Sequence, residues 1–202
     1  MVKKPIYAKS HTVDVRDMAR NLLQGIPGAM GNTRVHAEVL RNHLMKATMN
    51  LADVEFTIFA DEPVKFGGEG AAPLPFGYFM AGMLLCECAQ YSWNAAELGL
   101  IDKIYKLEMT IEGGFPVAPL FGMDDTKGKA AVPEIKVTTR IESDASPEEI
   151  EKLCRIVAWR CPAHQTVNRK VPYLNVVELN GTKIAEFGEQ DESPLKTGGK
   201  GE

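Results

Sequence analysis

Several sequence features that this 202-residue chain lacks exclude whole classes of function. It has no excess of basic residues, since its net charge is −4, so we expect no nucleic acid partner. Its least charged stretch, residues 66–85, is broken by glycine and proline, so we expect no membrane span. It lacks the CxxC, HExxH, P-loop and dinucleotide fingerprints, so we expect neither a metal nor a cofactor.

Cysteine is scarce, with four residues, and no secretory signal is visible. The basic start of the chain is not followed by an apolar stretch, which predicts a cytoplasmic protein whose thiols stay reduced. The apolar fraction of 45% and the charged fraction of 25% are those of an ordinary globular protein. A chain of this length can bury one substantial core.

The hydrophobic pattern predicts one α+β domain between two other segments. We expect residues 1–30 to form an extension with a short helix, residues 31–187 the domain, and residues 188–202 a disordered tail. The connection at 112–133 is unusually long, which is typical of a functional or mobile loop. Strands are predicted at 34–39, 44–49, 54–58, 105–111, 135–141, 173–179 and 183–187, and helices at 76–97 and 147–160. This order favours a mostly antiparallel sheet.

The first half of the predicted helix 76–97 is the most apolar part of the chain. It contains the run FGYFMAGMLLC, from Phe76 to Cys86, which has no charged residue. A helix that is apolar on every side must be covered all round. We therefore expect a partner surface against this segment.

Helical geometry limits which of the four cysteines can form a disulfide with each other. Cys86 and Cys88 lie about 200° apart around one helix, so they cannot bond to each other. Cys154 and Cys161 lie about 10.5 Å apart along a helix axis, which is beyond disulfide reach. Any redox pair therefore joins the two helices, and we favour Cys86 with Cys161. Pro162 predicts a helix start at Cys161, where the helix dipole favours a thiolate. The alternative for each thiol is an apolar core residue, which we expect for Cys88 and Cys154.

These residues resemble the OsmC/Ohr family of thiol peroxidases. The family pattern is a Gly/Pro loop, a proline eleven residues before the peroxidatic cysteine, and later a Cys-Pro pair at the second cysteine. The matching segments here are GGEGAAPLPFGYFMAGMLLC, with Pro75 and Cys86, and RCPAHQTV, with Cys161 and Pro162. The resemblance covers roughly residues 31–187.

The resemblance implies an OsmC-like fold, in which a mostly antiparallel sheet wraps around central apolar helices of an intertwined homodimer. It also implies a cysteine-based peroxidase that reduces organic hydroperoxides. Cys86 attacks the peroxide and becomes a sulfenic acid, and Cys161 condenses with it to a disulfide. The implied partners are a second copy of the chain, a small-molecule peroxide and an external dithiol reductant.

The family also supplies an arginine from the first strand turn, and Arg41 matches it, with Arg34 in reserve. The alternative for both is a solvated charge. A family glutamate normally follows the loop proline and holds the arginine, but Phe76 and Gly77 occupy those positions here. Glu69 or Glu87 could take over this role, although solvated carboxylates are the default interpretation for both.

Other assignments stay open at this point. The apolar part of the long connection, residues 115–123, is interpreted as a lid, a dimer contact or a mobile loop. His164 is either a neighbour of the Cys161 thiol or a surface histidine, and a zinc site made of Cys86, Cys161 and His164 is a minor alternative. The second hypothesis for the whole protein is a non-catalytic OsmC-fold protein that binds a small apolar ligand at the dimer interface.

Overall fold

The computed structural model describes residues 4–7, 33–51, 54–123, 130–169 and 171–188. The elements are β1 (Val35–Arg41), β2 (Leu44–Leu51), β3 (Val54–Ala60), η2 (Val64–Phe66), α2 (Pro75–Glu97), β4 (Ile104–Gly113), α3 (Val117–Leu120), β5 (Ile135–Ser143), α4 (Pro147–Arg160), α5 (Pro162–Val167), β6 (Leu174–Leu179) and β7 (Thr182–Gly188). The short helix expected within residues 1–30 lies outside the described residues. So does the predicted tail, apart from Gly188, which ends β7.

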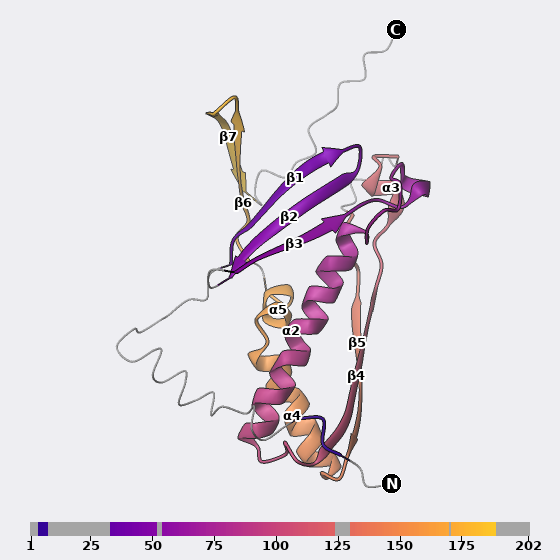
Figure 1. Cartoon of the computed structure of the whole chain (residues 1–202), viewed down its shortest axis with the longest axis vertical. Helices are drawn as coiled ribbons and strands as arrows, with labels where there is room; N and C mark the ends of the chain where they lie inside the picture. Colours follow the sequence, from indigo (N-terminus) through magenta and orange to yellow (C-terminus); the bar gives the residue numbers. More distant parts are fainter. Residues whose placement is uncertain (1–3, 8–32, 52–53, 124–129, 170, 189–202) are drawn as a thin grey trace, which may run out of the picture.

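The predicted α+β content and antiparallel pairing are confirmed, but the strands do not form one sheet within the chain. They form a three-stranded sheet in the order β1-β2-β3 and two hairpins, β4-β5 and β6-β7 (Figure 1). Asn180 and Gly181 form the tight turn of the last hairpin with φ angles of 53° and 79°, as their sequence predicts.

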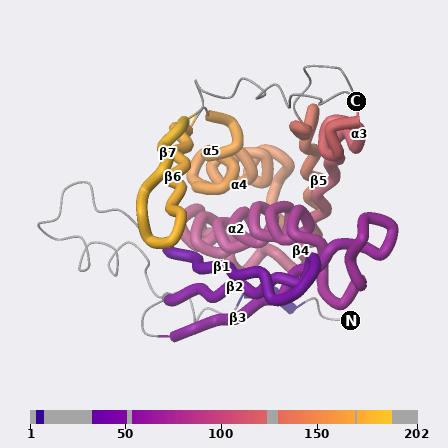
Figure 2. The backbone as a smooth tube through the Cα atoms, turned by 90° about the horizontal axis from the view of Figure 1, so that it is seen from above, coloured from indigo at the N-terminus to yellow at the C-terminus, as the bar shows by residue number. Residues whose placement is uncertain are grey.

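Helix α2 runs through the middle of the molecule. In Figure 2 it lies between the β1-β2-β3 sheet on one side and α4 with α5 on the other. Its main contacts are with α4, α5 and β4. Its buried residues recur at helical spacing and therefore share one face: Met80, Glu87, Tyr91, Asn94 and Ala95.

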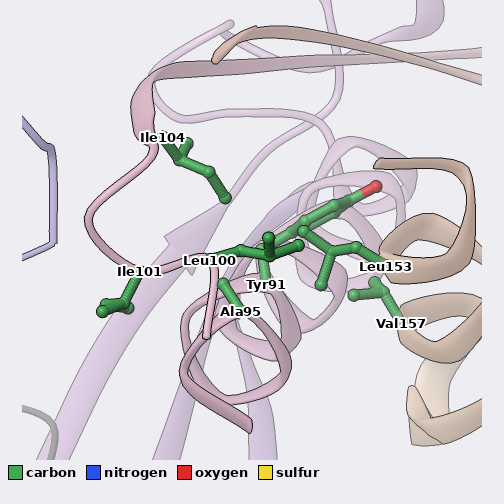
Figure 3. Packing of buried hydrophobic residues seen from close by; sticks show 7 residues of the cluster. All are labelled: Tyr91, Ala95, Leu100, Ile101, Ile104, Leu153 and Val157. Atoms are coloured by element: carbon green, nitrogen blue, oxygen red, sulfur yellow. The ribbon is translucent and has the colours of Figure 1, made fainter. Parts of the chain in front are cut away.

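The hydrophobic core surrounds the second half of α2. Tyr91 and Ala95 of α2 pack with Leu153 and Val157 of α4 and with residues of the link between α2 and β4 (Figure 3). The link residues of this cluster are Leu100, Ile101 and Ile104, the last at the start of β4. A fully buried aliphatic side chain contributes about 1.5–3 kcal/mol, so this cluster holds α2 and α4 in a fixed register.

The first half of α2 is not covered all round within the chain. Phe79 is 47% exposed and Leu85 is 67% exposed, although both belong to the uncharged run. The expected partner surface is therefore absent from this face among the described residues of the same chain. None of the helices in these residues has the length and the apolar content that a membrane span needs.

Helix α4 begins where its sequence predicts. The Ser146 side chain accepts a hydrogen bond from the backbone N–H of Glu149, and the Glu149 carboxylate accepts one from the backbone N–H of Ser146. Pro147 occupies the first helical position. This capping box satisfies amide groups that a helix start otherwise leaves unpaired. Glu149 also accepts a bond from Lys103, which ties the helix start to the link before β4.

Replacing Ser146 with alanine is expected to lower the free energy of unfolding by about 1 kcal/mol, because it removes the cap of α4. Urea denaturation followed by circular dichroism measures this change. Lys152→Ala is the matched control, since this residue lies on the exposed side of the same helix and its loss should change stability by less than about 0.5 kcal/mol. Equal midpoints for the two variants would contradict the role of the cap.

Candidate active site

Cys86 and Cys161 lie beside one another where α2 meets α5. Cys86 occupies the middle of α2, and Cys161 separates α4 from α5 and is the N-cap of α5. Cys161 is completely buried, Cys86 is partly buried, and both are free thiols. The two cysteines that the sequence singles out are thus neighbours, and their reactivity remains a prediction.

The environment of Cys161 differs from the one expected at a helix start. Burial raises the pKa of the Cys161 thiol, and the hydrogen bond and charge of Cys86 raise it further, while the amides of His164 and Ala163 oppose this. The amides at the start of this six-residue helix favour a thiolate, as expected, but the loss of water outweighs them.

The other two cysteines point to different partners. The Cys88 thiol donates to the sulfur of Met109 at 3.3 Å, and Cys154 accepts a hydrogen bond from the Tyr91 hydroxyl at 3.4 Å. Burial, followed by the charge of Glu87, raises the pKa of Cys88. Cys154 packs against the core, as does Met109, the partner of Cys88, which agrees with the core role expected for these thiols.

Glu87 and His164 form a second pair next to the two thiols. Glu87 is only 9% exposed, and its Oε2 lies 3.8 Å from Nδ1 of His164 on α5. The default interpretation of Glu87 as a solvated carboxylate is therefore wrong, because α2 turns this residue toward its buried face. Its spacing of four and seven residues from Tyr91 and Asn94 could have indicated this position.

The loop before α2 is built around the buried side chain of Asp61. Its carboxylate accepts three hydrogen bonds from the backbone, from Glu62 at 2.9 Å, Glu69 at 3.1 Å and Ala71 at 3.0 Å. These bonds, that of Ala71 first, lower the pKa of Asp61. The loop stability that they provide is therefore present above the ordinary pKa of aspartate and is lost as the pH falls through the lowered value.

This loop places a carboxylate beside the predicted active-site arginine. Arg41 ends β1 at a turn in which Asn42 has a φ of 48°. Its Nη2 donates to Oε2 of Glu69 at 2.9 Å. Glu69 thus provides the carboxylate partner that Phe76 and Gly77 cannot provide.

Within one chain, however, Arg41 and Cys86 are at different places along α2. The β1–β2 turn lies near the start of α2, because His43 of that turn lines the same cavity as Pro75. Cys86 follows Pro75 by eleven residues, which is about 16 Å along the helix. Arg34, the reserve candidate, is exposed just before the opposite end of β1. Within one chain Arg41 therefore lies well before the thiols along α2.

A cavity of about 400 Å³ lies at the start of α2. Residues of the long connection form part of its wall, and Phe115 among them packs edge-on against Phe76 with ring centroids 4.9 Å apart. Phe115 therefore lies well away from the two thiols of its own chain, because Phe76 precedes Cys86 by about 15 Å along the helix. The lining combines polar His43 and Glu62 with an apolar wall of Phe66, Leu74, Pro75, Phe76, Phe115, Leu120 and Phe121.

The fold and the site define an α+β protein with two free, adjacent cysteines from separate helices. The family model described as OsmC-like protein matches residues 68–173, just over half of the chain, including Cys86 and Cys161. The chain belongs to the OsmC-like family. No curated protein matches it in sequence.

Solved structures agree with this fold. An OsmC-like protein from Mycoplasma pneumoniae is 24% identical, with a TM-score of 0.57 over 69% of this chain and 89% of the other. A Psychrobacter arcticus protein assigned to the osmotic stress induced and detoxification response is 16% identical, with a TM-score of 0.51 over 69% of this chain and 90% of the other. A Vibrio cholerae protein assigned to organic hydroperoxide resistance, with captopril bound in one of its active sites, is 18% identical, with a TM-score of 0.50 over 70% and 88%.

The loop that carries Glu69 should not tolerate a side chain at Gly68. A Cβ there would lie 1.9 Å from the carbonyl oxygen of Glu62, so the backbone must shift. We expect Gly68→Ala to lower the free energy of unfolding by about 1–3 kcal/mol in urea denaturation. Gly114→Ala is the control, because nothing lies within 4 Å of a Cβ at that position. A Gly68→Ala protein as stable as the control would contradict this close approach.

Proposed function

We propose that this protein is a homodimeric, cysteine-based peroxidase that reduces organic hydroperoxides. The Cys86 thiolate attacks the O–O bond, takes one oxygen as a sulfenic acid and releases an alcohol. The Cys161 thiol then displaces the hydroxyl group as water and forms a Cys86–Cys161 disulfide. An external dithiol reduces this bond and becomes a disulfide itself.

The observation that carries this proposal is the contact between the Cys86 and Cys161 thiols. The two residues come from separate helices, and burial keeps Cys161 out of water. A resolving thiol in that place can reach a sulfenic acid on Cys86 without a large movement of the backbone. The family and the hydroperoxide resistance assigned to the Vibrio cholerae relative support the same chemistry.

The uncovered apolar surface supports the homodimer. Phe79 and Leu85 of α2 are exposed, as are Phe56 and Phe59 on the β1-β2-β3 sheet. Among the described residues, no strand pairs the β6-β7 hairpin with another sheet. Apolar patches of this kind, together with free strand edges, are typical of a surface that a partner covers. A second copy of the chain is the partner that the family resemblance implies.

A second copy also offers a role for Arg41. The guanidinium lies near the start of α2, and Cys86 lies about 16 Å further along the helix, so two α2 helices packed antiparallel would place Arg41 of one chain near Cys86 of the other. Glu69 would hold the guanidinium there, where it stabilises the thiolate and orients the peroxide oxygens.

Thiol counting and cysteine substitutions test the proposal directly. One equivalent of cumene hydroperoxide is expected to consume two thiols per chain, and mass mapping should find the Cys86–Cys161 disulfide. Cys86→Ser should abolish peroxide consumption, whereas Cys161→Ser should stop at a sulfenic acid on Cys86 that dimedone traps. Cys88→Ser and Cys154→Ser are the matched controls and should retain turnover. Equal turnover in Cys86→Ser and the wild type would reject the proposal.

Removal of the guanidinium tests the proposed role of Arg41. We expect Arg41→Ala to lower kcat/KM for cumene hydroperoxide by about 10²-fold, since an oriented charge near the reacting oxygens is lost. Arg34→Ala is the control and should behave like the wild type.

Mixed dimers show which chain supplies Arg41. Arg41→Ala chains combined with Cys86→Ser chains should regain activity, because one site of the mixed dimer has both residues from different chains. Absence of rescue in mixed dimers of verified composition would contradict the placement of Arg41 across the interface.

The cavity at the start of α2 favours a second candidate function, the binding of a small apolar ligand without catalysis. Its volume of about 400 Å³ lies in the range of small-molecule sites, and aromatic side chains dominate its wall. This function gains support if peroxide leaves the thiol count unchanged while an apolar fluorescent probe binds, and if Phe76→Ala weakens that binding.

A further inference from the structure

The cavity at the start of α2 has an aromatic wall that two distant segments build in pairs. Phe115 packs edge-on against Phe76 with ring centroids 4.9 Å apart, and Phe121 packs against Phe66 at 5.5 Å. One ring of each pair belongs to the connection after β4, and the other belongs to the loop before α2 or to the first turn of α2. Ring pairs of this kind favour defined orientations, so they hold residues 115–121 against the cavity.

Phe76 contributes to this wall at one of the two positions where the family pattern has a glutamate. Glu69 pairs with Arg41 from the preceding loop instead, at 2.9 Å. The position after Pro75 therefore carries an aromatic ring, and the wall at the start of α2 is apolar where the pattern has a charge. This departure makes the cavity suited to an aromatic group.

The cavity lies next to the guanidinium that the proposed reaction uses. His43, which lines the cavity, follows Arg41 by two residues at the β1–β2 turn. Two contacts hold this turn on the loop. One is the ion pair of Arg41 with Glu69, and the other brings the His43 imidazole against Gly67, where an added Cβ would lie 3.2 Å from Nε2. The cavity and the guanidinium therefore keep a fixed relation, and the proposed antiparallel dimer brings both toward Cys86 of the other chain.

The cavity is lined by one carboxylate, that of Glu62. The described residues of the lining include His43 but neither a lysine nor an arginine. The loop fixes the backbone of Glu62, whose N–H donates to Asp61 at 2.9 Å and whose carbonyl oxygen accepts from the N–H of Gly70 at 3.1 Å. In the part of the chain that the structure describes, no cation lies within ion-pair distance of the Glu62 carboxylate. A ligand with its own carboxylate would therefore meet a like charge, whereas an uncharged ring would not.

We propose that this cavity binds the organic group of the substrate and selects uncharged aromatic hydroperoxides. The inference rests on the proposed peroxidase function and adds no chemical step to it. The aromatic ring of the substrate lies against Phe76 and Phe121, and its hydroperoxide group points toward Arg41. The volume of about 400 Å³ lies near the lower end of the range for small-molecule sites, about 300–1,000 Å³, which suits one substituted ring. Glu62 disfavours substrates that carry a carboxylate, so these residues determine specificity and are not catalytic.

A comparison of two peroxides tests the role of the aromatic wall. The kinetics are measured on the reduced, full-length protein with an external dithiol. Phe121→Ala should lower kcat/KM for cumene hydroperoxide about tenfold, because apolar contacts with the substrate ring are lost. It should leave kcat/KM for hydrogen peroxide unchanged, since that substrate has no organic group. Met123→Ala is the matched control, because this residue of the same segment is 78% exposed and is not part of the lining.

A matched pair of charged and uncharged substrates tests the role of Glu62. Para-carboxycumene hydroperoxide and its methyl ester share one ring and differ in charge. We expect the wild type to have a kcat/KM for the acid about tenfold below that for the ester, and Glu62→Gln to remove this difference. Glu62→Gln should leave kcat/KM for cumene hydroperoxide unchanged. Glu178→Gln, on exposed β6, is the matched control. This arm does not depend on Phe121→Ala folding, since Gln keeps the shape of the side chain.

The outcomes separate this inference from the peroxidase function on which it rests. Phe121→Ala overturns the inference if, in the folded protein, it keeps the wild-type ratio of kcat/KM for cumene hydroperoxide to that for hydrogen peroxide. An acid-to-ester ratio that is unchanged in Glu62→Gln would overturn it as well. Failure of the wild type to consume any hydroperoxide would instead reject the proposed peroxidase function.

Discussion

The contact of α2 with α4 and α5 is the constraint on which the rest of the structure depends. Tyr91 and Ala95 of α2 pack against Leu153 and Val157 of α4, and this packing fixes the register of the two helices. The same register sets Cys86 against Cys161, one and a half turns before the core residues of α2. The site is therefore stabilised by the apolar cluster beside it rather than by its own polar contacts.

The two halves of α2 meet different surroundings. The second half is enclosed by elements of its own chain, whereas the first half keeps Phe79 and Leu85 exposed. Burial of such side chains is the largest favourable term in association as well as in folding. In the proposed homodimer, a second copy of the chain completes the apolar layer around the first half of α2.

The carboxylate that pairs with Arg41 comes from a different sequence position than the family pattern implies. The family glutamate after the loop proline is replaced by Phe76 and Gly77, and Glu69 pairs with Arg41 from the preceding loop. Asp61 fixes that loop through three backbone amides, one of them the amide of Glu69, so the ion pair depends on a buried group that binds only the backbone of its carboxylate residue.

The sequence by itself determined the elements that local contacts define. Ser146 and Pro147 start α4, Asn180 and Gly181 turn the last hairpin, and the uncharged run forms a helix, since each signal acts between residues close in the chain. The two cysteine contexts also indicated the OsmC-like family correctly. Only the tertiary structure decided that Glu87 meets His164, that burial raises the pKa of the Cys161 thiol, and that Arg41 pairs with Glu69. These properties depend on which distant segments exclude water from a side chain, and no pattern of neighbouring residues contains that information.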